Sequence, residues 1–342
     1  MTCDRCREAH DMGMRFCPWC GEPVKGGMGI LASPVRSIMM LCAIVCTILL
    51  VMEAYCLYAG TGSTFSFLAD YTNGIVIVFP ELITVCTISG PLLQAYWVFI
   101  VAALTLSFAF LAWDLYRSVK NRREGDVSEG VEHSTLYWVC IAFGVMYILS
   151  VLITVLIMVS GCMIEMPDTL PTTNSPEAIF LYAEAAVWEE IVSRVMLIGL
   201  PMTVLAAVLR KRDCLRYLLG GFGFSKASIV LLVFASVFFG LGHMSGWGLE
   251  KVLPAAVSGL VLGVLYIKFG VHAAMAVHFM TDYSVVVLDA TGTVITFIIL
   301  AVVVLGAVAL VGIAGKVWGT VASIPSMPNI LPNHDRSGPR RD

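Results

Sequence analysis

Residues 185–196 read Ala185-Ala186-Val187-Trp188-Glu189-Glu190-Ile191-Val192-Ser193-Arg194-Val195-Met196 and place three charged side chains within an apolar stretch. On membrane-insertion scales, each ionised group near the centre of an isolated membrane helix costs roughly 2.5–3.5 kcal/mol. Such groups persist where they pair, face the interior of a helix bundle or line a water-filled cavity. The segment therefore predicts a buried helix that carries a functional site.

The composition indicates a polytopic membrane protein. Of 342 residues, 58% are hydrophobic and 13% are charged, whereas a soluble domain carries about 25% charged residues. The net charge is −3 and the sequence has no basic patch, so nucleic acid is not an expected partner. The chain opens with Cys, Asp, Arg and Glu instead of a basic start and an apolar core, so we expect no cleavable signal peptide.

Eight apolar blocks have the length of a membrane-spanning helix, which is about 20 residues. They fall at about 37–59, 92–116, 135–160, 178–209, 227–246, 252–268, 271–290 and 293–316. Pro201 is expected to bend or break the long fourth block, since proline removes a backbone donor. Residues 75–88 are apolar but short and contain Pro80, which indicates a strand-like or re-entrant part of a loop. We therefore expect an all-α membrane bundle of about eight transmembrane helices.

Lysine and arginine are distributed unevenly among the connections, which predicts the orientation in the membrane. The loops at 60–91 and 161–177 contain neither residue type. Most basic residues lie in the alternate connections and the tail: Lys25, Arg36, Arg117, Lys120, Arg122, Arg123, Arg210, Lys211, Arg212, Arg216, Lys226, Arg336, Arg340 and Arg341. Lys251 is the one basic residue in an outer connection. We therefore expect both termini in the cytoplasm and a multi-pass protein of the plasma membrane or an equivalent lipid bilayer.

Two thiol hooks, Cys3-x-x-Cys6 and Cys17-x-x-Cys20, lie near the N-terminus with ten residues between them. Four thiolates at this spacing are typical of a tetrahedral structural Zn²⁺ site. A redox Cys-x-x-Cys pair is the alternative, but it does not account for two hooks. Because four thiolates leave no open coordination position, we expect a zinc ribbon that stabilises this segment or docks a protein partner.

The helix predicted at 178–209 separates its two adjacent carboxylates. Glu190 and Arg194 are spaced i and i+4, so they share a face and can pair. Glu189 is turned about 100° from Glu190 around the helix axis and points elsewhere. One carboxylate is thus neutralised, and the other is free to serve as a general base in an apolar cavity.

Two further polar elements follow in apolar spans. Phe239-Gly240-Leu241-Gly242-His243 ends one span, and His278 and Asp282 share one face of another, about 6 Å apart along the axis. Each element alone has a structural explanation, because a membrane histidine commonly packs or hydrogen-bonds and glycines allow close helix packing. Collected in one cavity, they offer a base, an imidazole and donors for an oxyanion, which peptide hydrolysis requires.

In order and spacing, these elements resemble the three motifs of the CPBP family: Glu189-Glu190-x-x-x-Arg194, Phe239-x-x-x-His243 and His278-x-x-x-Asp282. That family comprises type II CAAX prenyl endopeptidases, bacteriocin-processing enzymes and bacteriocin self-immunity proteins. The similarity covers about residues 175–290. It implies a glutamic intramembrane endopeptidase acting on a membrane-bound peptide or a prenylated protein, without a catalytic cofactor.

The resemblance also implies roles for the residues that would activate a water molecule for hydrolysis. Glu189 would activate water as the general base, and His243 would share that task. Arg194 would orient Glu190 and support the site.

The resemblance implies that His278 and Asp282 support the oxyanion. At the position of Asp282, the eukaryotic CAAX enzymes have Asn, whereas many other family members carry Asp. An ionised Asp cannot donate a hydrogen bond. Asp282 is therefore either protonated or orients His278 as an acceptor, and we favour the second interpretation.

On this interpretation the chain has four parts. Residues 1–27 form the zinc ribbon, 28–174 the N-terminal transmembrane helices and loops, 175–322 the CPBP-like catalytic membrane core, and 323–342 a disordered cytoplasmic tail.

Two other functions remain open. His243, His278 and Glu189 could ligate a catalytic zinc with one open position, although the usual His-Glu-x-x-His helix is lacking. A non-catalytic membrane adaptor or immunity-type protein would use the ribbon to recruit a partner. Counting along the helices brings Glu189 and His278 together near the bilayer middle, whereas His243 lies closer to the outer face unless Gly240 and Gly242 tilt or break its span.

Overall fold

The computed structural model describes residues 32–78, 82–120, 127–163, 171, 175–210 and 214–322. Within these ranges, the side chains of residues 32, 33, 78, 82, 288–291 and 315–322 are not described. The predicted zinc ribbon with Cys3, Cys6, Cys17 and Cys20 and the predicted tail at 323–342 lie outside the described residues.

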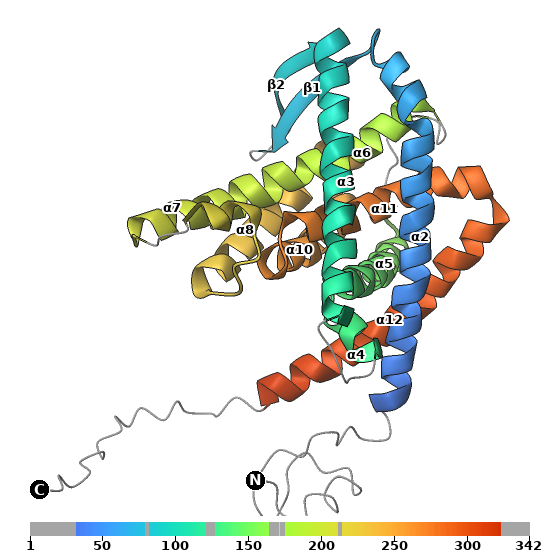
Figure 1. Ribbon diagram of the computed structural model, residues 1–342, viewed down its shortest axis with the longest axis vertical. Coiled ribbons are helices and arrows are strands. Elements are labelled where there is room, and N and C mark those ends of the chain that lie inside the picture. Colours follow the sequence, from blue (N-terminus) through green and yellow to red (C-terminus); the bar gives the residue numbers. More distant parts are fainter. Residues whose placement is uncertain are drawn as a thin grey trace, which may run out of the picture.

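The described chain is a helical bundle with one β-hairpin (Figure 1). Its helical elements are α2 (Ala32–Phe67), α3 (Gly90–Lys120), α4 (Val127–Glu132), α5 (Thr135–Val159), α6 (Pro176–Glu190), the π-helix η1 (Ile191–Gly199), α7 (Leu200–Val208), η2 (Cys214–Leu219), α8 (Lys226–Gly242), α9 (Met244–Trp247), η3 (Leu249–Lys251), α10 (Val252–Lys268), α11 (Val271–Thr291) and α12 (Thr293–Ala322). The predicted all-α membrane bundle is confirmed.

Seven of the eight predicted blocks correspond to segments that, within the described residues, are long and apolar enough to cross a membrane. They are α2, α3, α5, the continuous run α6–η1–α7, α8 with α9, η3 with α10, and α12. The block predicted at 271–290 forms α11, which lies at the centre of the bundle against α2, α3, α5, α6 and α10 (Figure 1). Because its neighbours enclose it, nearly every described side chain of α11 faces protein instead of lipid.

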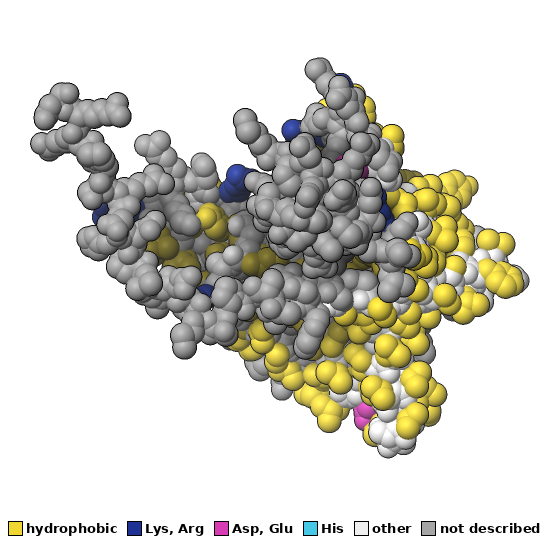
Figure 2. Space-filling view, turned by 90° about the horizontal axis from the view of Figure 1, so that it is seen from below, with side chains coloured by type: hydrophobic (Ala, Val, Ile, Leu, Met, Phe, Trp, Pro, Cys, Tyr) yellow, Lys and Arg dark blue, Asp and Glu magenta, His cyan; other side chains and the backbone are white. Residues whose placement is uncertain are grey.

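Apolar side chains cover the outside of the bundle, as a lipid-facing surface requires. Seen from below, they form a nearly continuous surface on one side of the molecule (Figure 2). Exposed apolar side chains recur at helical spacing on the two outer helices α2 and α12: Leu41, Ile44, Ile48, Val51 and Tyr55, then Phe297, Leu300, Val304 and Val311. The chain is an integral multi-pass membrane protein.

The long helix at 176–208 does not end at Pro201. Its N-terminus is capped by Ser175, whose hydroxyl accepts from the backbone N–H of Ala178. Directly after Glu190 the helix widens into η1, where the N–H of Leu200 bonds to the carbonyl of Val195 five residues back. Proline falls in the first turn of α7, where a missing donor costs little. The expected break is therefore a change of hydrogen-bond pattern, and it begins next to the candidate site.

The apolar stretch at 75–88 forms a β-hairpin, which confirms the strand-like alternative. Strand β1 (Thr72–Val78) pairs antiparallel with β2 (Leu82–Ser89), with Thr72 opposite Ser89. The hairpin is tied to α6, because Asn73 donates to Glu184 at 2.7 Å and the Trp188 indole donates to the Val76 carbonyl at 2.6 Å. The sequence did not predict where these strands would lie. The structure places β1 against α6, the helix that carries Glu189 and Glu190.

A tyrosine adds a third tie at the base of the hairpin. The Tyr71 hydroxyl donates to Glu177 at 2.9 Å. Burial, together with this hydrogen bond to a carboxylate, raises the pKa of Tyr71 to about 12. The phenol is therefore a neutral donor throughout the physiological pH range, and the tie does not depend on pH there.

Candidate active site

Three parts of the bundle bring the six predicted site residues together. Glu189 and Glu190 end α6 and Arg194 follows in η1, His243 caps the C-terminus of α8, and His278 and Asp282 lie on α11. His243 follows directly on α8, which ends at Gly242, and its ring still comes to 3.9 Å from Glu189. A Cβ at Gly240 would lie 2.6 Å from the Val252 carbonyl, so glycine lets α8 approach α10 closely.

A buried ion pair forms the floor of the site. Oε2 of Glu190 lies 3.1 Å from Nε of Arg194, and neither side chain is exposed. The Arg194 guanidinium also stands over the Phe239 ring, 4.9 Å from its centroid. Removal of either charge would leave the other uncompensated in an apolar interior.

His278 lies among three carboxylates. Its Nδ1 is 2.9 Å from Oε1 of Glu190, and its Nε2 is 3.4 Å from Oδ2 of Asp282 and 3.9 Å from Oε2 of Glu189. The ring is therefore held on both edges, one against α6 and the other along its own helix. Asp282 faces a ring nitrogen, which is the arrangement of an acceptor that orients the imidazole.

Glu189 and His243 face each other across a short gap. Nδ1 of His243 lies 2.8 Å from the Phe239 carbonyl, and because a carbonyl only accepts, Nδ1 carries the proton of this bond. That leaves Nε2 directed at Oε2 of Glu189, 3.9 Å away. The distance is too long for a direct hydrogen bond and suits a bridging water. Glu189 is also the most accessible of these acids, with its side chain 36% exposed.

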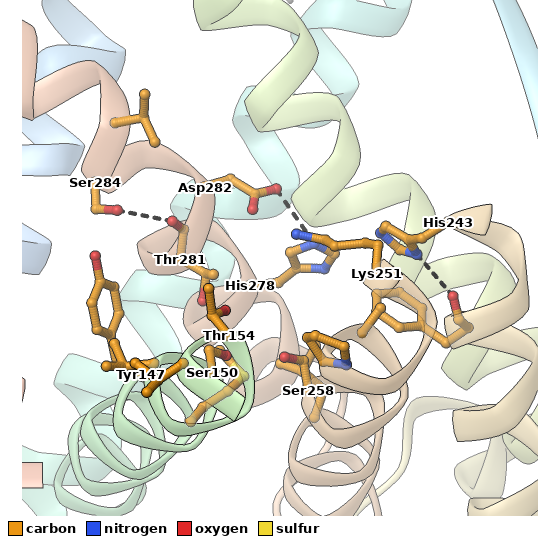
Figure 3. Close-up of a pocket in the computed structure, with 18 residues that line it drawn as sticks. Tyr147, Ser150, Thr154, His243, Lys251, Ser258, His278, Thr281, Asp282 and Ser284 are labelled. Atoms are coloured by element: carbon orange, nitrogen blue, oxygen red, sulfur yellow. Dashed lines mark hydrogen bonds and ion pairs between the residues drawn. The ribbon is translucent and has the colours of Figure 1, made fainter. Parts of the chain in front are cut away.

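Two cavities meet at this cluster. The larger, about 430 Å³, lies among α5, α8, α10 and α11 and is lined by His243, His278 and Asp282 together with several hydroxyl groups (Figure 3). The smaller, about 200 Å³, is lined by Glu189 and by mostly apolar groups that include Val76 of the hairpin. Since His243 lines both cavities, the cluster lies between a cavity that carries several hydroxyl groups and a smaller one lined mostly by apolar groups.

Lys251 is the site neighbour that sequence reasoning missed. We expected Lys251 to be the one basic residue of an outer connection, whereas its side chain lines the larger cavity near Asp282 (Figure 3). The feature of the sequence that could have indicated this role is a single lysine directly before the apolar block at 252–268. Within the ranges that the structure describes, no three His, Cys, Asp or Glu side chains are arranged to hold a metal ion.

Comparison with known proteins agrees with the geometry. Residues 171–284 match the family model described as Type II CAAX prenyl endopeptidase Rce1-like. The chain carries an Rce1-like domain. No curated protein and no solved structure matches the chain. The matched residues include all six clustered residues, and the match supports a CAAX-type intramembrane protease.

Proposed function

We propose that this protein is a glutamic intramembrane endopeptidase that cleaves a membrane-bound peptide, of the prenylated CAAX type, near its C-terminus. One observation carries the proposal: Oε2 of Glu189 lies 3.9 Å from Nε2 of both His243 and His278, at the junction of two cavities. A carboxylate and two imidazoles that enclose one small space can activate a water and stabilise the charge that develops next to it.

In the proposed reaction, Glu189 accepts a proton from the water while the water oxygen attacks the scissile carbonyl carbon. His243 orients that water through Nε2, because Nδ1 is committed to the Phe239 carbonyl. The carbonyl oxygen becomes an oxyanion, and the Nε2–H group of His278, which Asp282 orients from 3.4 Å away, donates a hydrogen bond to it. When the C–N bond breaks, the proton held by Glu189 passes to the leaving amine, which restores the carboxylate.

Glu190, Arg194 and Asp282 position these groups. Glu190 accepts from Nδ1 of His278 and is itself held by Arg194, so the ring plane is fixed from the floor of the site. Asp282 restrains the other edge of the ring. Pre-organised donors cost no reorganisation as the oxyanion forms, and this is the reason such support raises the rate.

The two cavities suggest how a substrate lies across the site. Trp188, Val192 and Trp247 line the smaller cavity, which suits the apolar, lipid-bearing side of the substrate. The larger cavity carries hydroxyl groups, which suit the peptide groups beyond the scissile bond. Cleavage between the two chambers would separate a membrane-anchored product from a short peptide.

The test is cleavage of a farnesylated peptide by the purified full-length chain in nanodiscs. Glu189→Gln is expected to lower turnover by about 10²–10⁴-fold, the usual contribution of a general base. Glu184→Gln is the matched control, since Glu184 lies on the same helix but accepts hydrogen bonds from Asn73 and Tyr96, which an amide oxygen also accepts. Equal thermal melting of both variants would show that folding is intact. Wild-type turnover by Glu189→Gln would refute the proposal.

The proposal extends to the chain termini. It places both in the cytoplasm, supported by Arg117 and Lys120 in the last turn of α3 and by loops without basic residues. It also places a structural Zn²⁺ on Cys3, Cys6, Cys17 and Cys20, with a partner protein docking there. Protection of an N-terminal tag from external protease in intact cells tests the orientation; digestion of the tag contradicts it.

A further inference from the structure

Lys251 lies at the start of a candidate membrane span and has no close counter-ion among the described residues. It ends η3 in the candidate span Leu249–Lys268. Its ammonium stands over the Trp247 ring, 4.4 Å from the centroid. Among the residues that the structure describes, no carboxylate lies within 4.0 Å of it. The side chain also lines the larger cavity, so an anion that enters this cavity can form a charge-assisted hydrogen bond with the ammonium.

Nearby acids do not take up that charge. Asp282 lines the same cavity, and Glu189 lies next to it, 3.9 Å from His243. Both are already committed: Asp282 faces Nε2 of His278 at 3.4 Å, and Glu189 faces two imidazoles. The ammonium is therefore left available to an anion that enters the cavity.

The wall of the larger cavity offers hydrogen-bonding groups that are also uncommitted. Ser150 and Thr154 lie one helical turn apart on α5, and Ser258 faces them from α10 (Figure 3). Within the described part of the chain, none of these three hydroxyls makes a hydrogen bond. Figure 3 shows the Lys251 side chain reaching across the same cavity toward His278 and Asp282. A ligand with several polar groups and one negative charge fits this lining.

From this arrangement we infer that Lys251 binds the free C-terminal carboxylate of the substrate, and that the larger cavity holds the short peptide end beyond the scissile bond. The inference rests on the proposed function and deepens it. A carboxylate accepts charge-assisted hydrogen bonds from an ammonium, and the peptide groups before it can bond to Ser150, Thr154 and Ser258. Lys251 would thereby select chain ends over internal segments, since an internal peptide bond carries no charge for it.

The test uses two lipidated peptides that differ only at the C-terminus, one a free acid and the other an amide. Both are cleaved by the full-length chain in nanodiscs of phosphatidylcholine alone, so that no anionic lipid competes for the lysine. We expect wild-type kcat/KM to favour the acid by at least about tenfold, as the loss of a hydrogen bond to a charged group implies. In Lys251→Gln this preference should disappear through loss of activity on the acid.

Lys268→Gln is the matched control. Lys268 ends α10, the helix that follows Lys251, and also stands 4.4 Å from an aromatic centroid, that of Trp138, but it does not line the cavity. This variant should keep the preference for the acid, and a thermal melt of both variants checks folding.

Two outcomes overturn the inference while Glu189-dependent cleavage stands. Equal kcat/KM for the acid and the amide peptide in the wild type would show that the enzyme does not recognise the C-terminal carboxylate. Equal slowing of both peptides by Lys251→Gln would show that the lysine acts on a step common to both.

A binding measurement decides the question independently of turnover. Titration calorimetry compares acid and amide peptides on the Glu189→Gln variant, which retains Lys251. Tighter binding of the acid, lost when Lys251→Gln is added, supports the inference. Equal affinities, or no binding of either peptide, overturn it. Loss of Glu189 dependence would instead refute the proposed function.

Discussion

Nδ1 of His278 lies 2.9 Å from Oε1 of Glu190, although the two residues are 88 positions apart in the chain. The other oxygen of the same carboxylate faces Arg194 at 3.1 Å. One buried carboxylate thus joins the central helix α11 to the helix that carries the proposed base. Stability and catalysis depend on the same contact, and suitable variants can separate them.

Glu190→Gln should destabilise the protein, because it leaves the Arg194 charge unpaired in a region without exposure to solvent. Breaking a buried pair from one side costs about 3–5 kcal/mol. We expect a lower melting temperature and a smaller folded fraction in detergent. The double variant Glu190→Leu with Arg194→Met removes both charges and should recover much of the stability, yet cleavage should stay low because Nδ1 of His278 loses its acceptor. Unchanged melting of the single variant would contradict the role of the pair.

Asp282→Ala should lower kcat by about 10²-fold with little change in KM, because a misplaced imidazole loses its alignment with the oxyanion. Asp282→Asn should keep most of the activity, since an amide oxygen still accepts from Nε2 of His278. Steady-state kinetics of both variants, with circular dichroism to check folding, makes the comparison. If Asp282→Ala were as active as the wild type, Asp282 would have no orienting role.

Glu53→Leu should stabilise the protein. Glu53 lies on α2 with no exposed surface, and neither carboxyl oxygen has a hydrogen-bond partner among the described residues. An unsatisfied buried polar group costs about 1–3 kcal/mol, and leucine removes it with little change in volume. We expect a higher melting temperature and unchanged kcat. A lower melting temperature would mean that the carboxyl has a stabilising partner in the membrane.

Gly306→Ala should separate α12 from α5. A Cβ at position 306 would collide with the backbone carbonyl of Gly144 on the facing helix, and overpacking costs about 1–3 kcal/mol. Gly62→Ala on α2 is the control, because a Cβ there meets nothing within 4 Å. Thermal melts should show a loss for the first variant and none for the second. Equal effects would show that the contact between the two glycines is not tight.

Chelation separates the glutamic mechanism from a metalloprotease. The full-length variant with serine at Cys3, Cys6, Cys17 and Cys20 should lose about one zinc per chain, as expected for a four-thiolate site. If Glu189 activates water directly, this variant should keep its cleavage rate in the presence of 1,10-phenanthroline. Inactivation that added Zn²⁺ reverses would favour a catalytic metal. Wild-type protein without bound zinc would remove the ribbon from the proposal.

Local spacing accounts for what could be predicted about this protein. The i and i+4 pairs, Glu190 with Arg194 and His278 with Asp282, follow from helical geometry, which needs no tertiary structure. Long apolar blocks indicated the helical membrane bundle in the same way. Because burying a charged side chain in lipid is unfavourable, we expected the charged residues of the apolar spans to face one another, and the structure does bring them together.

Packing between distant segments decided the rest. Gly240 lets α8 lie close to α10, and the Trp188 indole bonds to the carbonyl of Val76, 112 positions away in the sequence. The widening of η1 and the enclosure of α11 also depend on neighbours, not on local spacing. A helix specifies which residues share its face, but only the close packing of side chains from several helices determines which faces meet.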